Sequence, residues 1–138
     1  MSLDVFQDYL DRLDFDFEVD SENDAIDIMT ETKSGTEYAV TLIAGNRVYS
    51  LFVSPLVVPG ESCDTGKLHQ KLLELSEQLT YVKLSLDADG DIKIAAQGFT
   101  RLDAFGQFRR RLEALTAAID EHGADLAALA GGDLFSGE

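Results

Sequence analysis

The 138-residue sequence contains one cysteine and two histidines, and no apolar run of membrane-spanning length. A single thiol, Cys63, excludes an intramolecular disulfide and a cysteine-rich metal site. His69 and His122 lie far apart in the sequence, which argues against a zinc site. Acidic residues interrupt the N-terminal segment and no basic stretch precedes them, so we expect no signal peptide. These absences predict a protein of a reducing compartment, the cytoplasm.

Basic residues are also scarce, with 11 lysines and arginines against 26 carboxylates and a net charge of −15. Such a charge repels nucleic-acid phosphates and anionic membranes, so we predict neither as a partner. It favours a basic or amphipathic protein partner, although adaptation to high salt would give the same composition. A hydrophobic content of 45% indicates a globular chain. We assign residues 1–130 to one domain and residues 131–138 to a flexible tail.

The stretch from residue 66 to 96 is the most regular part of the sequence. Leucines spaced four, three and four residues apart predict an amphipathic helix, which Leu73 widens. These leucines are Leu68, Leu72, Leu75 and Leu79. We interpret this stripe as core or as a dimer seam, with core favoured. Strict alternation then predicts two strands, 82–86 and 92–96, joined by a turn at 87–90.

The flanking segments supply two more helices. Leu3, Phe6, Leu10 and Leu13 predict a first helix, with Ser2 as its N-cap. The third helix is predicted from Phe105, Phe108, Leu112, Leu115 and Ile119. Thr100 and Asp103 fit a capping box before this helix, and Gly123 is expected to end it. Leu126 and Leu129 allow one further helical piece.

Strands are predicted at 25–32, 37–44 and 47–53. Gly45–Asn46 predicts a two-residue hairpin with positive φ, and Pro55 is expected to end the third strand. Residues 14–24 alternate phenylalanine and valine with carboxylates, which fits either a short edge strand or an extended connection. The eleven acidic residues up to Glu31 form either a solvated face or a docking surface for a basic partner.

The order of these elements is α-β-β-β-α-β-β-α. Strands that are joined by tight turns form antiparallel sheets, and amphipathic helices pack against them. The sequence therefore predicts an α+β fold with an antiparallel five-stranded sheet.

Several motifs carry possible chemistry. Residues 87–91, Asp-Ala-Asp-Gly-Asp, resemble the middle of a calcium loop, but Ser85 and Ala96 replace the required carboxylates at its two ends, so a hairpin turn is favoured. Cys63, Asp64 and His69 are interpreted as surface residues rather than as a nucleophile and base. The arginines at 109–111 either bind an acidic ligand or lie over acidic neighbours. We assign no catalytic, cofactor or metal residue.

The element order over residues 3–122 resembles the type III secretion chaperone-like fold, including its YbjN-like bacterial branch. The strongest local match runs from Leu72 to Leu79, through Tyr81–Asp87, to Asp89–Ile92. The resemblance implies a non-enzymatic homodimer that handles another protein. Secretion chaperones hold an extended segment of a client, whereas the YbjN-like branch is associated with regulatory or stress-response roles.

The strand around residue 50 carries apolar residues on both faces, which indicates a central strand or a second face that meets another protein. We predict partner contact at Tyr49, Leu51, Val53, Leu56 and Val57. A client would add an extended segment to exposed apolar positions or to a sheet edge. Rival hypotheses are a small-ligand or metal sensor, an enzyme with unrecognised carboxylate chemistry, and an acidic phosphate mimic.

Overall fold

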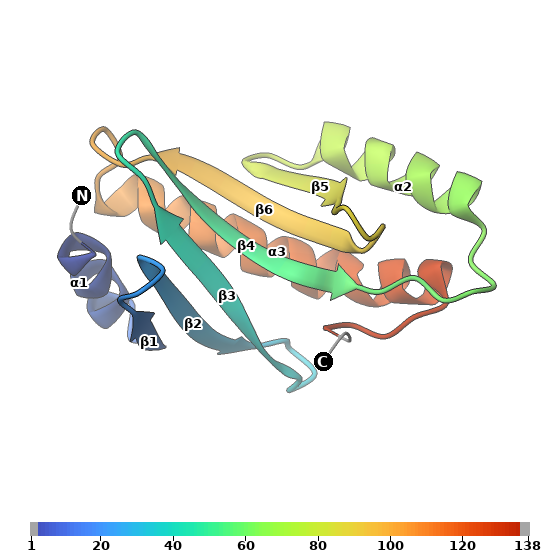
Figure 1. Ribbon diagram of the computed structural model, residues 1–138, viewed down its shortest axis with the longest axis horizontal. Helices are drawn as coiled ribbons and strands as arrows, with labels where there is room; N and C mark the ends of the chain where they lie inside the picture. Colours follow the sequence, from blue (N-terminus) through green and yellow to red (C-terminus); the bar gives the residue numbers. More distant parts are fainter. Residues whose placement is uncertain (1–2, 136–138) are drawn as a thin grey trace.

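The computed structural model describes residues 3–135. Its elements are α1 (Asp4–Arg12), β1 (Asp16–Asp20), β2 (Ala25–Glu31), β3 (Glu37–Ala44), β4 (Val48–Val57), α2 (Thr65–Gln78), β5 (Val82–Leu86), β6 (Ile92–Phe99) and α3 (Phe105–Ala130). The strands form one antiparallel sheet in the order β1-β2-β3-β4-β6-β5. The long helix α3 runs behind this sheet, and α1 and α2 lie at opposite ends of the molecule (Figure 1). Within residues 3–135, no helix is both long and apolar enough to cross a bilayer.

The α+β class and the antiparallel sheet are confirmed, but the sheet has six strands, so the predicted number of five is wrong. The additional strand is β1, which resolves the alternatives for residues 14–24 in favour of an edge strand. Phe17 pairs with Ile28 and Val19 with Ile26 in register with β2. Three carboxylates in five residues obscured the strand pattern, because acidic residues are normally depleted from strands.

The core lies between the sheet and the helices. Alternate strand residues point toward α3, as the period of two requires. The rings of Phe6, Tyr49 and Phe108 join α1, β4 and α3, with centroids 5.1 to 5.8 Å apart. Fully burying a large apolar side chain contributes roughly 1.5–3 kcal/mol, so the inner face of the sheet accounts for much of the stability of the fold.

Helix α3 continues through Gly123, so the predicted end of the helix there is wrong. Glycine in a helix interior costs about 1 kcal/mol relative to alanine. Here the missing side chain leaves room for Leu134, whose Cδ2 would lie 3.1 Å from a Cβ added at position 123. The helix ends instead at Gly131, which has φ of 65°. His122 therefore lies inside the helix and not near its end.

The predicted capping box is also wrong. Ala104 precedes α3, and its backbone N–H donates a 3.0 Å hydrogen bond to Oε1 of Gln107. Thr100 is buried. Asp103 accepts a 2.8 Å hydrogen bond from the Tyr49 hydroxyl and lies 3.2 Å from Nη1 of Arg111. The Asp103 carboxylate thus ties the central strand β4 to α3.

Two strands contain a residue that is unusual in a strand interior, and the predicted end of the third strand at Pro55 is wrong. Strand β4 passes through Pro55, where the register with β6 shifts between Val53 and Val57. Strand β6 passes through Gly98, which pairs with Tyr49. The turn between β3 and β4 lies where it was predicted, but neither Gly45 nor Asn46 has positive φ. A three-residue connection replaces the predicted two-residue turn.

Residues 131–135, the described part of the predicted tail, pack against β3 and β4, and the flexibility of the tail stays a prediction. Leu134 pairs with Val57, and the backbone N–H of Phe135 donates a 2.7 Å hydrogen bond to the carbonyl of Leu56. The Phe135 ring stacks on Tyr38 with centroids 4.5 Å apart. Burial, reinforced by the charge of Asp120, raises the pKa of Tyr38 to about 12. Residues 136–138 and the predicted N-cap Ser2 lie outside the described residues.

Glycine at position 98 is required by close packing. A Cβ there would overlap the Tyr49 phenol and the Asp103 carboxylate. We expect Gly98→Ala to lower the free energy of unfolding by about 2 kcal/mol or more, measured by urea denaturation. Gly106→Ala on α3 is the matched control, because a Cβ at position 106 meets no atom within 4 Å. Equal stability of the Gly98→Ala variant and the unmodified chain would contradict this packing.

Candidate functional site

No helix among residues 3–135 packs across one face of the sheet, which α2 borders at β5, and Figure 1 shows the molecule from this side. We call it the helix-free face. It consists of the strand residues that alternate with the buried ones. From the edge at β1 to the edge at β5 it includes Glu18, Ala25, Asp27, Met29, Ala39, Thr41, Ile43, Val48, Ser50, Phe52, Lys93, Ala95, Gln97, Phe99 and Lys83.

Large apolar side chains are exposed on this face. Ile43 and Val48 are each 43% exposed and Phe99 is 52% exposed. Val48 pairs with Phe99 across β4 and β6, and Leu102, 78% exposed, extends the apolar area into the following loop. Val48, Phe99 and Leu102 line a groove of about 530 Å³ together with Arg47 and Arg101. Contiguous exposed apolar surface of this kind marks an association site.

Acidic and basic side chains lie on opposite halves of the helix-free face. One unbroken row of cross-strand neighbours crosses all six strands. In order it contains Glu18, Asp27, Thr41, Phe52, Ala95 and Lys83. Thr41 Oγ1 donates a 3.0 Å hydrogen bond to Asp27, and Nζ of Lys93 lies 4.8 Å from the Phe52 ring centroid. The face therefore has an acidic half on β1 and β2, an apolar centre, and a basic half on β6 and β5.

The five residues predicted to contact a partner lie on the opposite side. Tyr49, Leu51, Val53, Leu56 and Val57 are at most 5% exposed and belong to the core. They are not available to a partner unless the core opens, so contact through them stays a prediction. The pattern of apolar residues on both faces of β4 was the correct signal: the strand is central, and its other face remains open. The outward-facing residues of β3 and β6, which extend the same open face, were not predicted as contact residues.

The leucine stripe of α2 is mainly core. Leu68, Leu72 and Leu75 are buried and Leu79 is half-buried, whereas Leu73 is 74% exposed and lies outside the stripe. Between α2 and the edge strand β5 runs a groove of about 200 Å³, which we call the α2–β5 groove. It is lined by His69, Leu72, Leu73, Leu84, Ser85 and Leu86.

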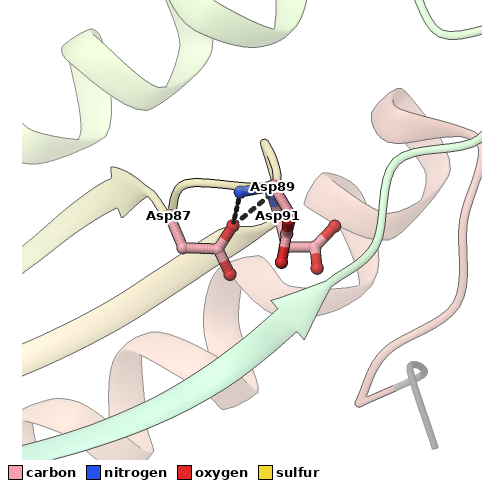
Figure 2. A group of neighbouring side chains, drawn as sticks. All are labelled: Asp87, Asp89 and Asp91. Carbon is pink, nitrogen blue, oxygen red and sulfur yellow. Dashed lines mark hydrogen bonds between the residues drawn. The ribbon is translucent and has the colours of Figure 1, made fainter.

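The acidic motif forms the turn between β5 and β6. Oδ1 of Asp87 accepts hydrogen bonds from the backbone N–H groups of Asp89 and Asp91, at 2.9 and 3.0 Å (Figure 2). Gly90 has φ of 85°, which glycine adopts without strain. One carboxylate oxygen from each aspartate lies within 4.8 Å of the others. The hairpin-turn interpretation is confirmed, and the turn itself explains the position of Asp87.

The other motifs have local structural roles. Asp64 caps α2 by accepting a 3.2 Å hydrogen bond from the Lys67 backbone. Cys63 is half-buried with its Sγ 4.0 Å from the carbonyl of Leu129. Arg109 forms an exposed 2.7 Å ion pair with Glu113, and this hydrogen bond raises the pKa of Arg109. The interpretation of these arginines as neighbours of acidic residues holds for two of them, Arg109 and Arg111.

A helix-backed antiparallel sheet with one open face defines the class of protein. No protein-family model and no curated protein sequence matches the chain. Solved structures do match. YbjN from E. coli, a proposed transcription regulator, aligns with a TM-score of 0.60 over 91% of this chain and 93% of that chain, at 18% identity.

Two complexes of other proteins give similar matches. A chain of the heterodimeric ExoU–SpcU complex from the type III secretion system of Pseudomonas aeruginosa aligns with a TM-score of 0.60, at 19% identity, over 89% of this chain and 95% of that chain. A chain of the HopA1–SchA chaperone–effector complex aligns with a TM-score of 0.57, at 15% identity, over 86% and 91%. The chain therefore has the YbjN-like, type III secretion chaperone-like fold, as the resemblance implied. Identities this low establish the fold alone.

The acidic turn at 87–91 leads to a testable prediction about the pKa of Asp91. Desolvation of the Asp91 carboxyl and the nearby charges of Asp87 and Asp89 raise the pKa of Asp91 above its ordinary value. Asp89→Asn removes one of these charges, so we expect the Asp91 pKa to fall toward the ordinary value in a carboxyl NMR titration. Asp133→Asn, a change outside the turn, is the control. An Asp91 pKa that does not move would show that the three carboxylates are farther apart than described.

Proposed function

We propose that this chain is a non-enzymatic, cytoplasmic protein-binding module, chaperone-like or regulatory, that acts as a homodimer and holds a segment of a partner protein. The observation that carries the proposal is the exposure of large apolar side chains on the helix-free face of the sheet. Water-exposed apolar surface of this extent is unfavourable by about 25 cal/mol per Å², so covering it with protein drives association.

The similar structures support this class of function. Two of them are complexes, one named as heterodimeric and one as chaperone with effector. The third is a proposed transcription regulator, which favours the regulatory variant of the proposal equally well. Both variants require surfaces that recognise another polypeptide.

Two of the carboxylate groups have structural rather than catalytic roles. The buried carboxylate of Asp103 is already paired with Tyr49 and Arg111. The cluster at 87–91 lies on a turn, and the Asp87 carboxylate is hydrogen-bonded to the turn backbone. A catalytic pair needs carboxylates that converge on a substrate cavity, and neither of these groups is placed in that way.

We assign the partner segment to the α2–β5 groove. Leu73 and Leu86 are exposed on its two walls, 74% and 40% respectively, while Leu72 and Leu84 form its floor. The groove follows an edge strand, where an extended segment can place alternate apolar side chains between helix and sheet. Ser76 Oγ lies 3.4 Å from both the backbone nitrogen and the carbonyl of Leu84, so α2 limits direct strand addition at that residue.

Selection from a displayed library of random peptides tests this assignment. We expect the chain to select extended segments with apolar residues at alternate positions. Leu73→Asp combined with Leu86→Asp should weaken the selected peptide by about tenfold or more, because it charges both walls of the groove. The measurement is peptide affinity by fluorescence polarisation.

Val5→Asp on α1 is the matched control, since Val5 is 39% exposed and lies at the other end of the molecule (Figure 1). Unchanged affinity of the double variant would place the segment elsewhere. Failure to select any peptide that binds at micromolar concentration would count against a segment-holding function.

A further inference from the structure

We propose that a second copy of this chain covers the helix-free face, packed sheet against sheet about a two-fold axis that runs along the strands between β3 and β4. This inference rests on the homodimer of the proposed function and assigns its contact surface. It is argued from the symmetry of the strand order, from charge, from side-chain size and from area.

The strand order is suited to this axis. In the order β1-β2-β3-β4-β6-β5 the seam between β3 and β4 is the centre of the sheet. A two-fold rotation about the seam places β3 opposite the β4 of the second copy, β2 opposite β6, and β1 opposite β5. Closed two-fold symmetry of this kind buries the same surface on both subunits, as most homodimers do. Aligned sheets pack with their strands about 30° apart.

The distribution of charge favours a two-fold axis along the strands over one perpendicular to them. Glu18 on β1 and Lys83 on β5 belong to the same cross-strand row, so the rotation brings each Glu18 opposite a Lys83. Asp27 on β2 likewise faces β6, which carries Lys93. A two-fold axis perpendicular to the strands would instead place the acidic halves together and the basic halves together. Opposite charges on facing patches fix the orientation of an interface.

Side-chain size is also complementary across this axis. Phe52 pairs with Thr41 in the sheet, and Ile43 pairs with Ser50. Because the rotation exchanges β3 and β4, Phe52 of one copy faces Thr41 of the other, and Ile43 faces Ser50. Large side chains then oppose small ones in both central rows, as close-packed interfaces require.

The available area is sufficient for a stable dimer. Six strands spaced about 4.8 Å apart, from 5 residues long in β1 and β5 to 10 in β4, cover roughly 650 Å² per copy. Two copies would bury roughly 1,300 Å², which reaches the range of about 1,200–2,000 Å² that specific interfaces occupy. The net charge of −15 on each copy opposes association, so the local charge pairs have to offset a general repulsion.

Charge exchange tests the proposed interface. The first variant carries Lys83→Glu and Lys93→Glu, and the second carries Glu18→Lys and Asp27→Lys. Each variant alone places like charges on both halves of the interface, so we expect each to weaken the homodimer by about tenfold or more. Mixing them should restore a dimer of one copy of each, because one face is then wholly acidic and the other wholly basic.

Analytical ultracentrifugation with light scattering measures the masses, and circular dichroism confirms that each variant is folded. Lys67→Glu with Lys71→Glu on α2 is the control, since it makes the same charge change away from the face. If the unmodified chain is a monomer at tens of micromolar, both this inference and the homodimer are overturned.

Two other outcomes overturn the inference alone. A dimer that is insensitive to both charge variants would have its contact surface elsewhere, and the proposed homodimer would stand. A peptide that binds the helix-free face while the dimer stays intact would show that a partner segment, and not a second copy, is the occupant of that face.

Discussion

A sheet has two faces, and within residues 3–135 the helices pack across only one of them. Apart from the irregularity at Pro55 in β4, the strands alternate between side chains that point toward α3 and side chains that point away. On the inner face the alternation produces a continuous apolar core. On the outer face it leaves isoleucine, valine and phenylalanine in contact with water. The folded chain therefore buries one face of the sheet and leaves apolar side chains of the other exposed to water.

The covered face is held in a fixed position, which makes the open face a rigid surface. Tyr49 on the central strand reaches past Gly98 to Asp103, and Asp103 in turn meets Arg111 on α3. Burial and the hydrogen bond to Asp103 raise the pKa of Tyr49, so its hydroxyl remains protonated and continues to donate across the physiological range. A preorganised surface loses little conformational entropy when it binds, which favours association.

Much of the fold follows from local patterns in the sequence. The strands at 25–31 and 37–44 and the helix that begins before Leu68 were predictable, since their apolar periods are strong and one-sided. The limits of the prediction arise where tertiary contacts override local signals. Helix α3 continues through Gly123, where the missing side chain leaves room for Leu134. Asp103 pairs with Tyr49 and Arg111 instead of capping α3.

The candidate site was predictable in part. Apolar residues on both faces of β4 indicated either a central strand or a face that meets another protein, but the sequence does not determine which face the helices cover. Which face is covered depends on the packing of α3, and the periodicity of the strands alone does not determine that packing. The separation of acidic and basic side chains on the helix-free face depends on the order of the strands in the sheet. Because β6 lies between β4 and β5, this order differs from the order in the sequence, so the separation of charge is visible only once the topology is known.

The central claim is that protein covers the helix-free face in solution. The chain contains no tryptophan, so Phe52→Trp places a single fluorescent reporter at the centre of this face. The most direct measurement is the emission maximum of this variant at micromolar and at nanomolar concentration, with Val5→Trp on α1 as the exposed reference. The account predicts blue-shifted emission at micromolar concentration that moves toward that of the reference on dilution. Emission that matches the reference at every concentration would contradict it.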